Sequence, residues 1–292
     1  MTASNFNSSD LVLLGVPFDE KASLGLGSRF APKVIRELSS QIPPYTMDRI
    51  SLKNFNIHDF GDTTCFKEAM DLVMKALRKQ KFILTLGGDH SISIYLQKAF
   101  YNYAKSKNLI PVLIHIDAHP DLCDIYDNQL DSHATTVRRA IDNGYNIEDI
   151  ILIGIRGYEE EEVAFLEKNK ELKVFDSNFL NNYGFLELLN YLKNKYNDKK
   201  YIIYLSYDID ANDPGFAPGT GTPEAFGLNN KLLLDFIKEI MYSLPILAMD
   251  IVEVSPPLDV NNITSWLAVK TMYEIFKIIE DKKNETHNSG LL

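Results

Sequence analysis

The stretch Tyr201-Ile-Ile-Tyr-Leu-Ser-Tyr-Asp208 decides the fold class, because in extended backbone it is apolar on both faces. A strand with two apolar faces is covered by helices on both sides, as in parallel α/β sheets. Comparable runs of strand length recur along the chain, at Leu11–Val16, Phe55–Phe60, Phe82–Leu86, Val112–Asp117, Ile150–Ile155, Lys173–Phe175 and Ile246–Val254.

Longer amphipathic stretches alternate with these runs, at Pro32–Ser39, Lys67–Gln80, Ile92–Lys107, Thr135–Asn143, Glu160–Lys170, Phe185–Lys195, Lys231–Ser243 and Thr264 to about Lys282. Strand and helix in alternation predict an α/β fold with a mostly parallel sheet. No linker or change of composition divides the 292 residues. We therefore interpret residues 1–292 as one domain, in which the polar ends 1–9 and 283–292 are predicted to be flexible tails.

Composition excludes several classes of protein. The chain has 30 Lys+Arg against 40 Asp+Glu, a formal net charge of −10, which argues against a nucleic-acid or anionic-membrane binder. The two cysteines, Cys65 and Cys123, are too few and too far apart for a disulfide scaffold or a thiolate zinc site. The chain shows neither a basic leader segment nor an apolar run of ~18 residues. We expect a soluble, cytoplasmic protein.

Polar side chains close the strand predicted over Val112–Asp117. Asp117, His119 and Asp121 stand two residues apart, so an extended backbone points all three to one face. Pro120 disfavours a helix at this point. Ligand-type side chains that converge at one strand end favour a metal site, and a loop of solvated Asp residues is the alternative.

Two more carboxylates follow the strand that ends at Asp208. Asp208 and Asp210 share a face by the same period of two. Their mutual repulsion would raise the pKa of each carboxyl unless a cation lies between them. A turn open to water is the alternative, and it fits Asp213 best because Pro214 follows it.

The segment Gly87-Gly-Asp-His-Ser91 follows the strand Phe82–Leu86 and opens a predicted helix. The glycines allow close approach of backbone, and His90 projects from the strand-to-helix turn. A helix cap formed by Asp89 or Ser91 is the alternative. A phosphate-binding loop is excluded, because no Lys follows the glycines.

Together these segments supply six candidate ligands: His90, Asp117, His119, Asp121, Asp208 and Asp210. Four carboxylates and two imidazoles are too many and too rich in oxygen for one tetrahedral zinc. They suit two ions of the Mn²⁺ type with octahedral preference. Two such ions about 3.5–4 Å apart generate a nucleophilic hydroxide at neutral pH. The residues by themselves therefore predict metal-assisted hydrolysis.

Two further residues are candidates for catalysis. His133 starts a predicted helix close behind Asp121, although a surface histidine is the plainer interpretation. Glu253 is an acid among apolar neighbours near a strand end, and a planar cationic group would be a suitable partner. A Glu on a solvated strand face is its alternative. We expect His115, deeper in its strand, to be a hydrogen-bonded core residue rather than a ligand.

Several long segments resemble known motifs in matching order. Residues 87–91, Asp-Ala-His-Pro-Asp at 117–121 and Ser-Tyr-Asp-Ile-Asp-Ala-Asn-Asp-Pro at 206–214 resemble the metal motifs of the ureohydrolase (arginase/agmatinase) family. Ala-Pro-Gly-Thr-Gly-Thr-Pro-Glu at 217–224 and Asp-Ile-Val-Glu-Val-Ser-Pro-Pro-Leu-Asp at 250–259 resemble its agmatinase branch. The similarity extends from about Leu11 to about Ile279.

This resemblance implies a three-layer αβα fold with a parallel sheet of about eight strands. It also implies two Mn²⁺ ions per chain and a homo-oligomer, often a trimer or hexamer. One ion would be bound by His90, Asp117, Asp121 and Asp208. The other would be bound by His119, Asp117, Asp208 and Asp210, so that Asp117 and Asp208 bridge the two ions.

The implied reaction is hydrolysis of a small cationic guanidino substrate, with agmatine giving putrescine and urea. The metal-bridging hydroxide attacks the guanidinium carbon, and the tetrahedral intermediate collapses to urea and an amine. By the same resemblance, Asp121 orients the hydroxide and helps to protonate the leaving amine. His133 matches the proton-shuttle histidine, and Glu253 matches the carboxylate that binds the guanidinium.

Departures from the family pattern concern the substrate. Ser132-His-Ala-Thr-Thr136 stands where Ser-His-Gly-Thr-Pro is usual, and Ala225-Phe226 replaces a common Pro-Gly. Arginase is disfavoured, because the Gly-Asn before its shuttle histidine is absent. The acidic residues Asp124, Asp127 and Asp131 would suit a second ammonium, as in agmatine, or are solvated.

Other functions stay open from the sequence. Within the family they are guanidinobutyrase, guanidine hydrolase, arginase and formimidoylglutamase. From different classes, a single-zinc amide hydrolase of the related deacetylase fold and a non-catalytic homologue are the alternatives.

Overall fold

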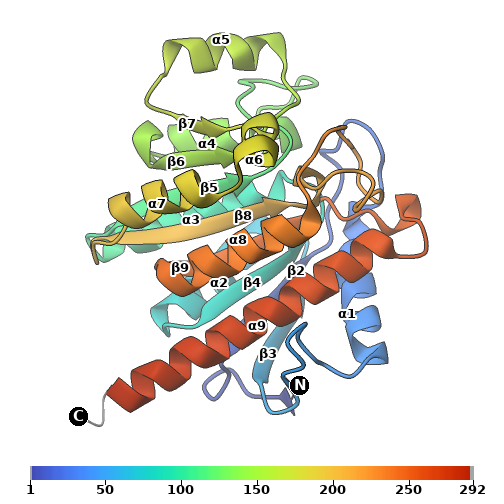
Figure 1. Cartoon of the computed structure of the whole chain (residues 1–292), viewed down its shortest axis with the longest axis vertical. Coiled ribbons are helices and arrows are strands. Elements are labelled where there is room, and N and C mark those ends of the chain that lie inside the picture. The colour runs from blue at the N-terminus through green and yellow to red at the C-terminus, as the bar shows by residue number, and fades with distance from the viewer. Residues whose placement is uncertain (1, 290–292) are drawn as a thin grey trace.

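The computed structural model describes residues 2–289, which form a three-layer α/β fold around one sheet (Figure 1). The pairings between its nine strands are all parallel. From edge to edge the order is β1 (Thr2–Ala3), β3 (Asn56–Asp62), β2 (Leu11–Val16), β4 (Phe82–Gly87), β9 (Ile246–Val252), β8 (Tyr201–Asp208), β5 (Ile110–Ile116), β6 (Ile150–Ile153) and β7 (Lys173–Phe175). The predicted α/β class with a parallel sheet of about eight strands is confirmed. The two-residue strand β1 was not predicted from the sequence.

Helices cover both faces of the sheet. One layer consists of α1 (Ala31–Gln41), α7 (Leu186–Lys195), α8 (Asn230–Ser243) and α9 (Ile263–Ser289). Of these, α7, α8 and α9 cross in front of the strands in Figure 1. The other layer consists of α2 (Phe66–Arg78), α3 (Ile92–Ser106) and α4 (Thr136–Asp142). Neighbours within each layer pack on one another, as α1 does on α9 and α2 does on α3.

Alternate residues of each central strand feed two separate hydrophobic cores. In β2, Leu11 and Leu13 pack into the core under α1, α8 and α9, whereas Val12 and Leu14 pack into the core under α2 and α3. This division follows from the period of two in a strand. It is the physical reason why these strands read as apolar on both faces in the sequence.

One helix of this fold has no counterpart in the sequence prediction. Helix α6 spans Ser177–Tyr183, just before α7, and α5 spans Glu160–Lys168. The residues of α6 are rich in Asn and polar Ser, which have low helix propensity. Its start is stabilised by Asp176, whose carboxylate accepts a hydrogen bond from the Phe179 N–H at 2.7 Å. A short helix held by its cap carries too little periodic signal to be predicted.

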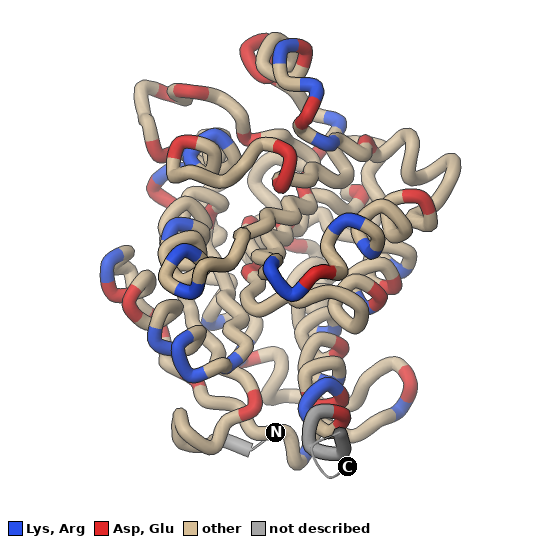
Figure 2. Tube along the Cα trace, turned by 90° about the vertical axis from the view of Figure 1, so that its left-hand side faces the viewer, with Lys and Arg blue, Asp and Glu red and all other residues tan. Residues whose placement is uncertain are grey.

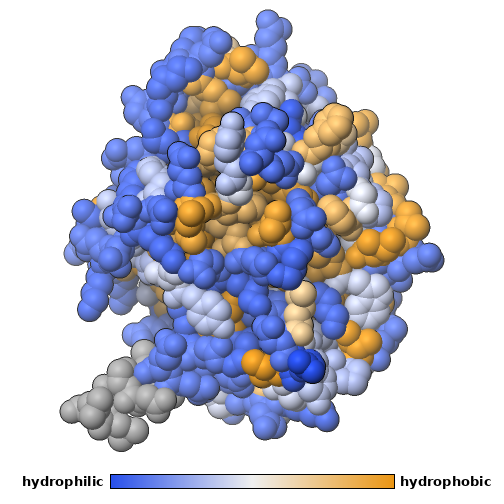
Figure 3. Space-filling model, in the orientation of Figure 1, coloured by the Kyte–Doolittle hydropathy of each residue, from blue (hydrophilic) through white to orange (hydrophobic). Residues whose placement is uncertain are grey.

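Residue 1 and residues 290–292, which belong to the predicted flexible tails, lie outside the described residues. Within the described part, no helix combines the length and the apolar composition that a membrane crossing requires. Basic and acidic residues are interspersed along the chain in Figure 2. The face drawn in Figure 3 is mostly hydrophilic, and apolar side chains show between the polar ones near its middle.

The strand order positions the functional motifs. β4, β9, β8 and β5 are neighbours in the sheet, although they are far apart in the chain. Because all four are parallel, their carboxyl ends lie at the same edge. Asp208 is the last residue of β8, and the segments that follow the other three strands carry His90, Glu253 and Asp117, so residues from four separate parts of the sequence meet in one place.

Gly88 allows the turn after β4 to pack against the segment after β2. Its N–H donates to the Val16 carbonyl at 3.0 Å, and the Asp89 N–H donates to the Phe18 carbonyl at 2.7 Å. A Cβ atom at position 88 would lie only 1.7 Å from the Phe18 carbonyl oxygen. Glycine is therefore required here by the approach of two backbone segments.

We predict that Gly88→Ala lowers the free energy of unfolding by about 3 kcal/mol, because a backbone segment must move to admit the methyl group. Gly215→Ala is the control: its Cβ would meet only the Asp213 carboxylate, at 3.1 Å, in an exposed loop. Urea denaturation in the presence of EDTA measures both variants. Equal denaturation midpoints for the two would contradict the assignment.

Candidate metal centre

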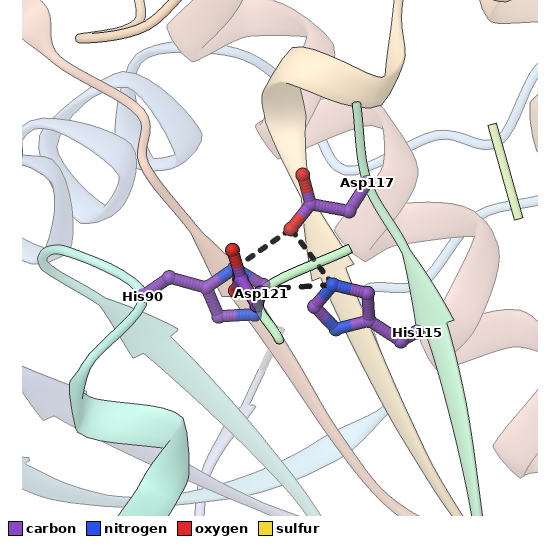
Figure 4. Close-up of side chains that lie close together, drawn as sticks. All are labelled: His90, His115, Asp117 and Asp121. Atoms are coloured by element: carbon purple, nitrogen blue, oxygen red, sulfur yellow. Dashed lines mark ion pairs between the residues drawn. The ribbon is translucent and has the colours of Figure 1, made fainter. Parts of the chain in front are cut away.

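The first group of predicted ligands converges on the Nδ1 atom of His90. This atom lies 2.9 Å from Asp117 Oδ2, 3.1 Å from Asp208 Oδ2 and 3.3 Å from Asp121 Oδ2. An octahedral ion with bonds of about 2.1 Å separates adjacent ligand atoms by about 3 Å. Figure 4 shows His90 reaching in from the turn after β4 towards Asp117 and Asp121 from the end of β5. These four residues are therefore spaced as ligands of one ion would be.

The second group lies beside the first and shares Asp117 with it. His119 Nδ1 is 3.2 Å from Asp210 Oδ2 and 3.5 Å from Asp117 Oδ1. The two oxygens of Asp117 thus face different groups, Oδ2 towards His90 and Oδ1 towards His119. The structure brings all six predicted ligands together, in an arrangement in which one carboxylate can contact two ions.

His115 also belongs to the first group. The six predicted ligands do not include it, since we expected a core histidine there. Its ring is fully buried and stacks on His90 with centroids 4.9 Å apart. Its Nε2 lies 3.0 Å from Asp117 Oδ2 and 3.2 Å from the His119 carbonyl oxygen. It stands among residues that could hold an ion. The signal in the sequence was its place two residues before Asp117, on the same strand face.

Several of these atoms have no hydrogen-bond partner in the described part of the protein. They are His90 Nδ1, Asp117 Oδ2 and Asp121 Oδ2, and each is buried. Buried polar atoms are nearly always satisfied, because an unsatisfied one loses its hydration without compensation. Atoms of this kind that face one another fit a cation between them.

The charges of the cluster lead to the same conclusion. Burial raises the pKa of Asp208 well above its usual value, and the neighbouring carboxylates of Asp210 and Asp117 raise it further. Burial lowers the pKa of His90, but the adjacent Asp117 and Asp121 outweigh this effect and raise it to about 10. Positive charge is therefore favoured at this point, and divalent ions would supply it.

Asp121 and Glu253, two predicted catalytic residues, adopt left-handed backbone conformations with φ of 53° and 62°. Such a conformation costs a non-glycine residue about 1–3 kcal/mol and often occurs at functional sites. Glu253 Oε1 accepts a hydrogen bond from the His90 N–H at 2.7 Å. Its carboxylate is thereby fixed beside the cluster, where burial and the charge of Asp89 raise its pKa.

His133, the third predicted catalytic residue, also reaches the cluster. It begins a short 3-10 helix (His133–Thr135) after Ser132, whose N–H donates to Thr135 Oγ1 at 2.9 Å. The Nε2 atom of His133 lies 3.1 Å from the hydroxyl of Ser23. Burial lowers the pKa of His133 to about 4, as do the charges of His90 and His119. The imidazole is thus neutral at pH 7 and can accept a proton.

A cavity of about 290 Å³ opens over the cluster. Its walls contain the following charged or titratable side chains: His90, Asp117, His119, Asp121, Tyr126, His133, Tyr158, Glu159, Glu162, Asp208, Glu224 and Glu253. Among the described residues, no Lys or Arg lines this cavity. Apart from histidines and tyrosines, the ionisable side chains of this cavity are therefore all carboxylic acids.

The acidic side chains suggested to bind a second ammonium are not part of the described cavity wall. Asp124 pairs instead with Arg139, at 2.8 Å, and with Arg138, at 3.4 Å. Asp131 accepts a hydrogen bond from the Tyr95 hydroxyl at 2.9 Å. The hypothesis that this loop binds a second ammonium is therefore wrong, because local partners already pair with the carboxylates of Asp124 and Asp131. Residues from other segments, Glu159 and Glu224, supply acidic side chains at the cavity wall.

A model of the arginase family matches residues 9–277. The chain belongs to the arginase family. A guanidinobutyrase of Pseudomonas aeruginosa is 32% identical over 94% of this chain and 88% of its own length. An agmatinase of Bacillus anthracis is 35% identical over 93% of this chain and 92% of its own length. The solved agmatine ureohydrolase of Thermoplasma volcanium superposes with a TM-score of 0.84 at 29% identity, over 97% of this chain and 94% of that one.

These comparisons confirm the family and the class of enzyme predicted from the sequence, a hydrolase of the ureohydrolase type. They leave the substrate open within the arginase family, since relatives with different named substrates are about equally similar.

We predict that Mn²⁺ raises the thermal stability of the metal-free protein, by about 2.7 kcal/mol when its concentration is 100 times the dissociation constant. Asp208→Asn should abolish most of this gain. Without metal the variant should be at least as stable as the parent, because the raised pKa of Asp208 means that its charge opposes folding at pH 7.

Thermal melts of the parent and of Asp208→Asn, in EDTA and in MnCl₂, measure the stability of each metal-free protein and its gain from Mn²⁺. Asp71→Asn, at an exposed position on α2, is the matched control and should keep the full gain. A full Mn²⁺ effect in Asp208→Asn would contradict the assignment of the cluster.

Proposed function

We propose that this protein hydrolyses a small cationic guanidino compound of the agmatine type to urea and an amine, with two Mn²⁺ ions per chain. The observation that carries the proposal is the acidic cavity over the histidine–carboxylate cluster. Its floor can hold divalent ions, and its walls offer only negative charge to the rest of the substrate.

The ligand sets are those implied by the family resemblance. His90, Asp117, Asp121 and Asp208 would hold one ion, and His119, Asp117, Asp208 and Asp210 would hold the other. When bound, the ions supply a nucleophile from water at neutral pH. The choice of manganese is supported by a donor set of carboxylates and imidazoles without thiolates.

Glu253 is proposed to bind the guanidinium group. A carboxylate can accept paired hydrogen bonds from the N–H groups of a planar guanidinium, which fixes the orientation of the plane. The hydrogen bond from the His90 N–H to Oε1 holds the side chain in place before substrate arrives. The raised pKa of the carboxyl would fall again beside a cation, which couples its ionisation to substrate binding.

Asp121 and His133 are proposed to transfer protons during the reaction. Oδ2 of Asp121 faces the first ligand group, and the other oxygen of this carboxylate can accept a hydrogen bond from the attacking water and so orient it. The leaving amine needs a proton, which Asp121 can return to it. His133 is neutral and stands at the cavity wall beside Ser23, so it can exchange protons between the site and solvent.

The absence of a cation from the described cavity lining favours agmatine over 4-guanidinobutyrate. The two substrates carry the same guanidinium but opposite charges at the far end of the chain. A carboxylate there would face Glu159 and Glu224 without a compensating Lys or Arg. The ammonium of agmatine would be attracted by the same side chains.

The homo-oligomeric state is an expectation from the resemblance, and the cytoplasmic location is an expectation from the sequence. A single-zinc hydrolase is disfavoured because the cluster divides into two groups that share Asp117. A non-catalytic homologue is disfavoured because five of the six ligands, His133 and Glu253 line one cavity, and the sixth ligand, Asp210, contacts His119.

We predict that the Mn²⁺-loaded enzyme releases urea from agmatine with a kcat/KM at least tenfold higher than from 4-guanidinobutyrate. A single charge pair across the cavity is worth about 1–2 kcal/mol at intermediate dielectric, which corresponds to roughly tenfold or more. A urea assay with agmatine, 4-guanidinobutyrate, arginine and guanidine measures this preference. A preference for 4-guanidinobutyrate would overturn the choice of substrate.

We also predict that His133→Ala lowers kcat on agmatine by about 10²–10⁴, the usual contribution of a proton-transfer group, without changing the number of bound Mn²⁺ ions. His58→Ala is the control, because His58 lies on β3 and bonds to the Ser4 carbonyl away from the cavity. Steady-state kinetics and elemental analysis test the pair of variants. Unchanged turnover in His133→Ala would remove this residue from the mechanism.

A further inference from the structure

We propose that Ser206 and Asp250 are positioning residues that hold the ring of His90 so that its Nδ1 faces the ion. The proposal rests on the proposed metal site and adds two residues to it. His90 Nε2, on the far side of the ring from the ligand cluster, lies 2.9 Å from Ser206 Oγ. Ser206 Oγ in turn lies 2.9 Å from Asp250 Oδ1. All three side chains are buried.

The carboxylate of Asp250, at the end of this hydrogen-bond chain, determines which group donates and which accepts in each bond. A carboxylate can only accept, so the Ser206 hydroxyl donates its proton to Asp250. The lone pairs of the same hydroxyl are then available to His90, whose Nε2 must carry the proton and donate it. In this tautomer the lone pair of the neutral imidazole is on Nδ1, which faces Asp117, Asp121 and Asp208. The chain therefore selects the metal-binding tautomer.

Asp250 is held firmly enough to anchor the chain. It lies in β9, where its neighbours are Thr85 of β4 and Ser206 of β8. Tyr204 donates to Oδ2 at 2.7 Å, and the Tyr207 N–H donates to Oδ1 at 3.2 Å. The position of the carboxylate is thus set by the centre of the sheet, which deforms less than a loop.

A variant of Ser93 is the control that distinguishes a positioning role of Ser206 from a purely structural one. Its hydroxyl also donates to Asp250, at 2.6 Å, but to Oδ2, and it is equally buried. Ser93→Ala and Ser206→Ala therefore remove the same chemical group and one hydrogen bond from the same carboxylate. Only Ser206 contacts the His90 ring through its side chain. Ser93 contacts His90 through its backbone N–H, which donates to the His90 carbonyl at 3.0 Å and is retained in Ser93→Ala.

The test is Mn²⁺ titration of the full-length metal-free protein by calorimetry, without substrate. In Ser206→Ala we expect one of the two sites to bind 10–100 times more weakly, the usual effect of removing the partner of a ligating histidine. In Ser93→Ala we expect both affinities to stay within about threefold of the parent. Ser206→Thr retains the hydroxyl and should bind closer to the parent than Ser206→Ala.

Two results would overturn the proposal. One is parental affinity at both sites in Ser206→Ala, and the other is equal weakening in Ser206→Ala and Ser93→Ala, which would make the network merely structural. Thermal melts in EDTA show whether each variant is folded before titration. Because no substrate is used, a parent that binds two Mn²⁺ but does not cleave agmatine would reject the proposed substrate and leave this inference standing. A parent that binds no Mn²⁺ would reject the inference itself.

Discussion

Repulsion between buried carboxylates is the constraint on which the site depends. Asp117, Asp121, Asp208 and Asp210 are nearly inaccessible to solvent and lie around two imidazoles. Such a group opposes folding at neutral pH unless cations neutralise it. The same repulsion makes binding of divalent ions favourable, because the ions relieve an unfavourable charge that the fold already contains. Affinity for metal and a reduced stability of the metal-free protein thus have one physical origin.

The scaffold tolerates this charge because it has two hydrophobic cores. Each central strand contributes alternate residues to the two cores, so the sheet is held from both sides. The carboxyl ends of the strands are then free to carry polar residues in unfavourable conformations, as at Asp121 and Glu253. The strained conformations of Asp121 and Glu253 lie beside the carboxylate cluster at one edge of the sheet, and burial in the two cores offsets their cost.

The three candidate metal-binding segments are recognisable in the amino-acid sequence alone, because each lies at the end of an apolar strand and two of them place acids, in one case with a histidine, two residues apart. Local geometry was sufficient for those residues. His115 is buried and hydrogen-bonded, as expected, but local geometry did not predict its contact with Asp117 or its stacking on His90. The short helix α6 was missed because a single capping aspartate stabilises a segment with little helical pattern. Charge in the loop after Asp121 was misleading, since nearby arginines bind Asp124.

The sequence by itself determined the class of fold, the nature of the ligands and the kind of reaction, because these follow from short-range periodicity and from side-chain chemistry. Only the tertiary structure decided which strands are neighbours, and hence that His90, Ser206 and Asp250 form one hydrogen-bond chain. It also decided which acidic side chains line the cavity and that, among the described residues, no Lys or Arg does. The reason is that pairing of parallel strands joins segments that are distant in the chain, and no local pattern encodes that order.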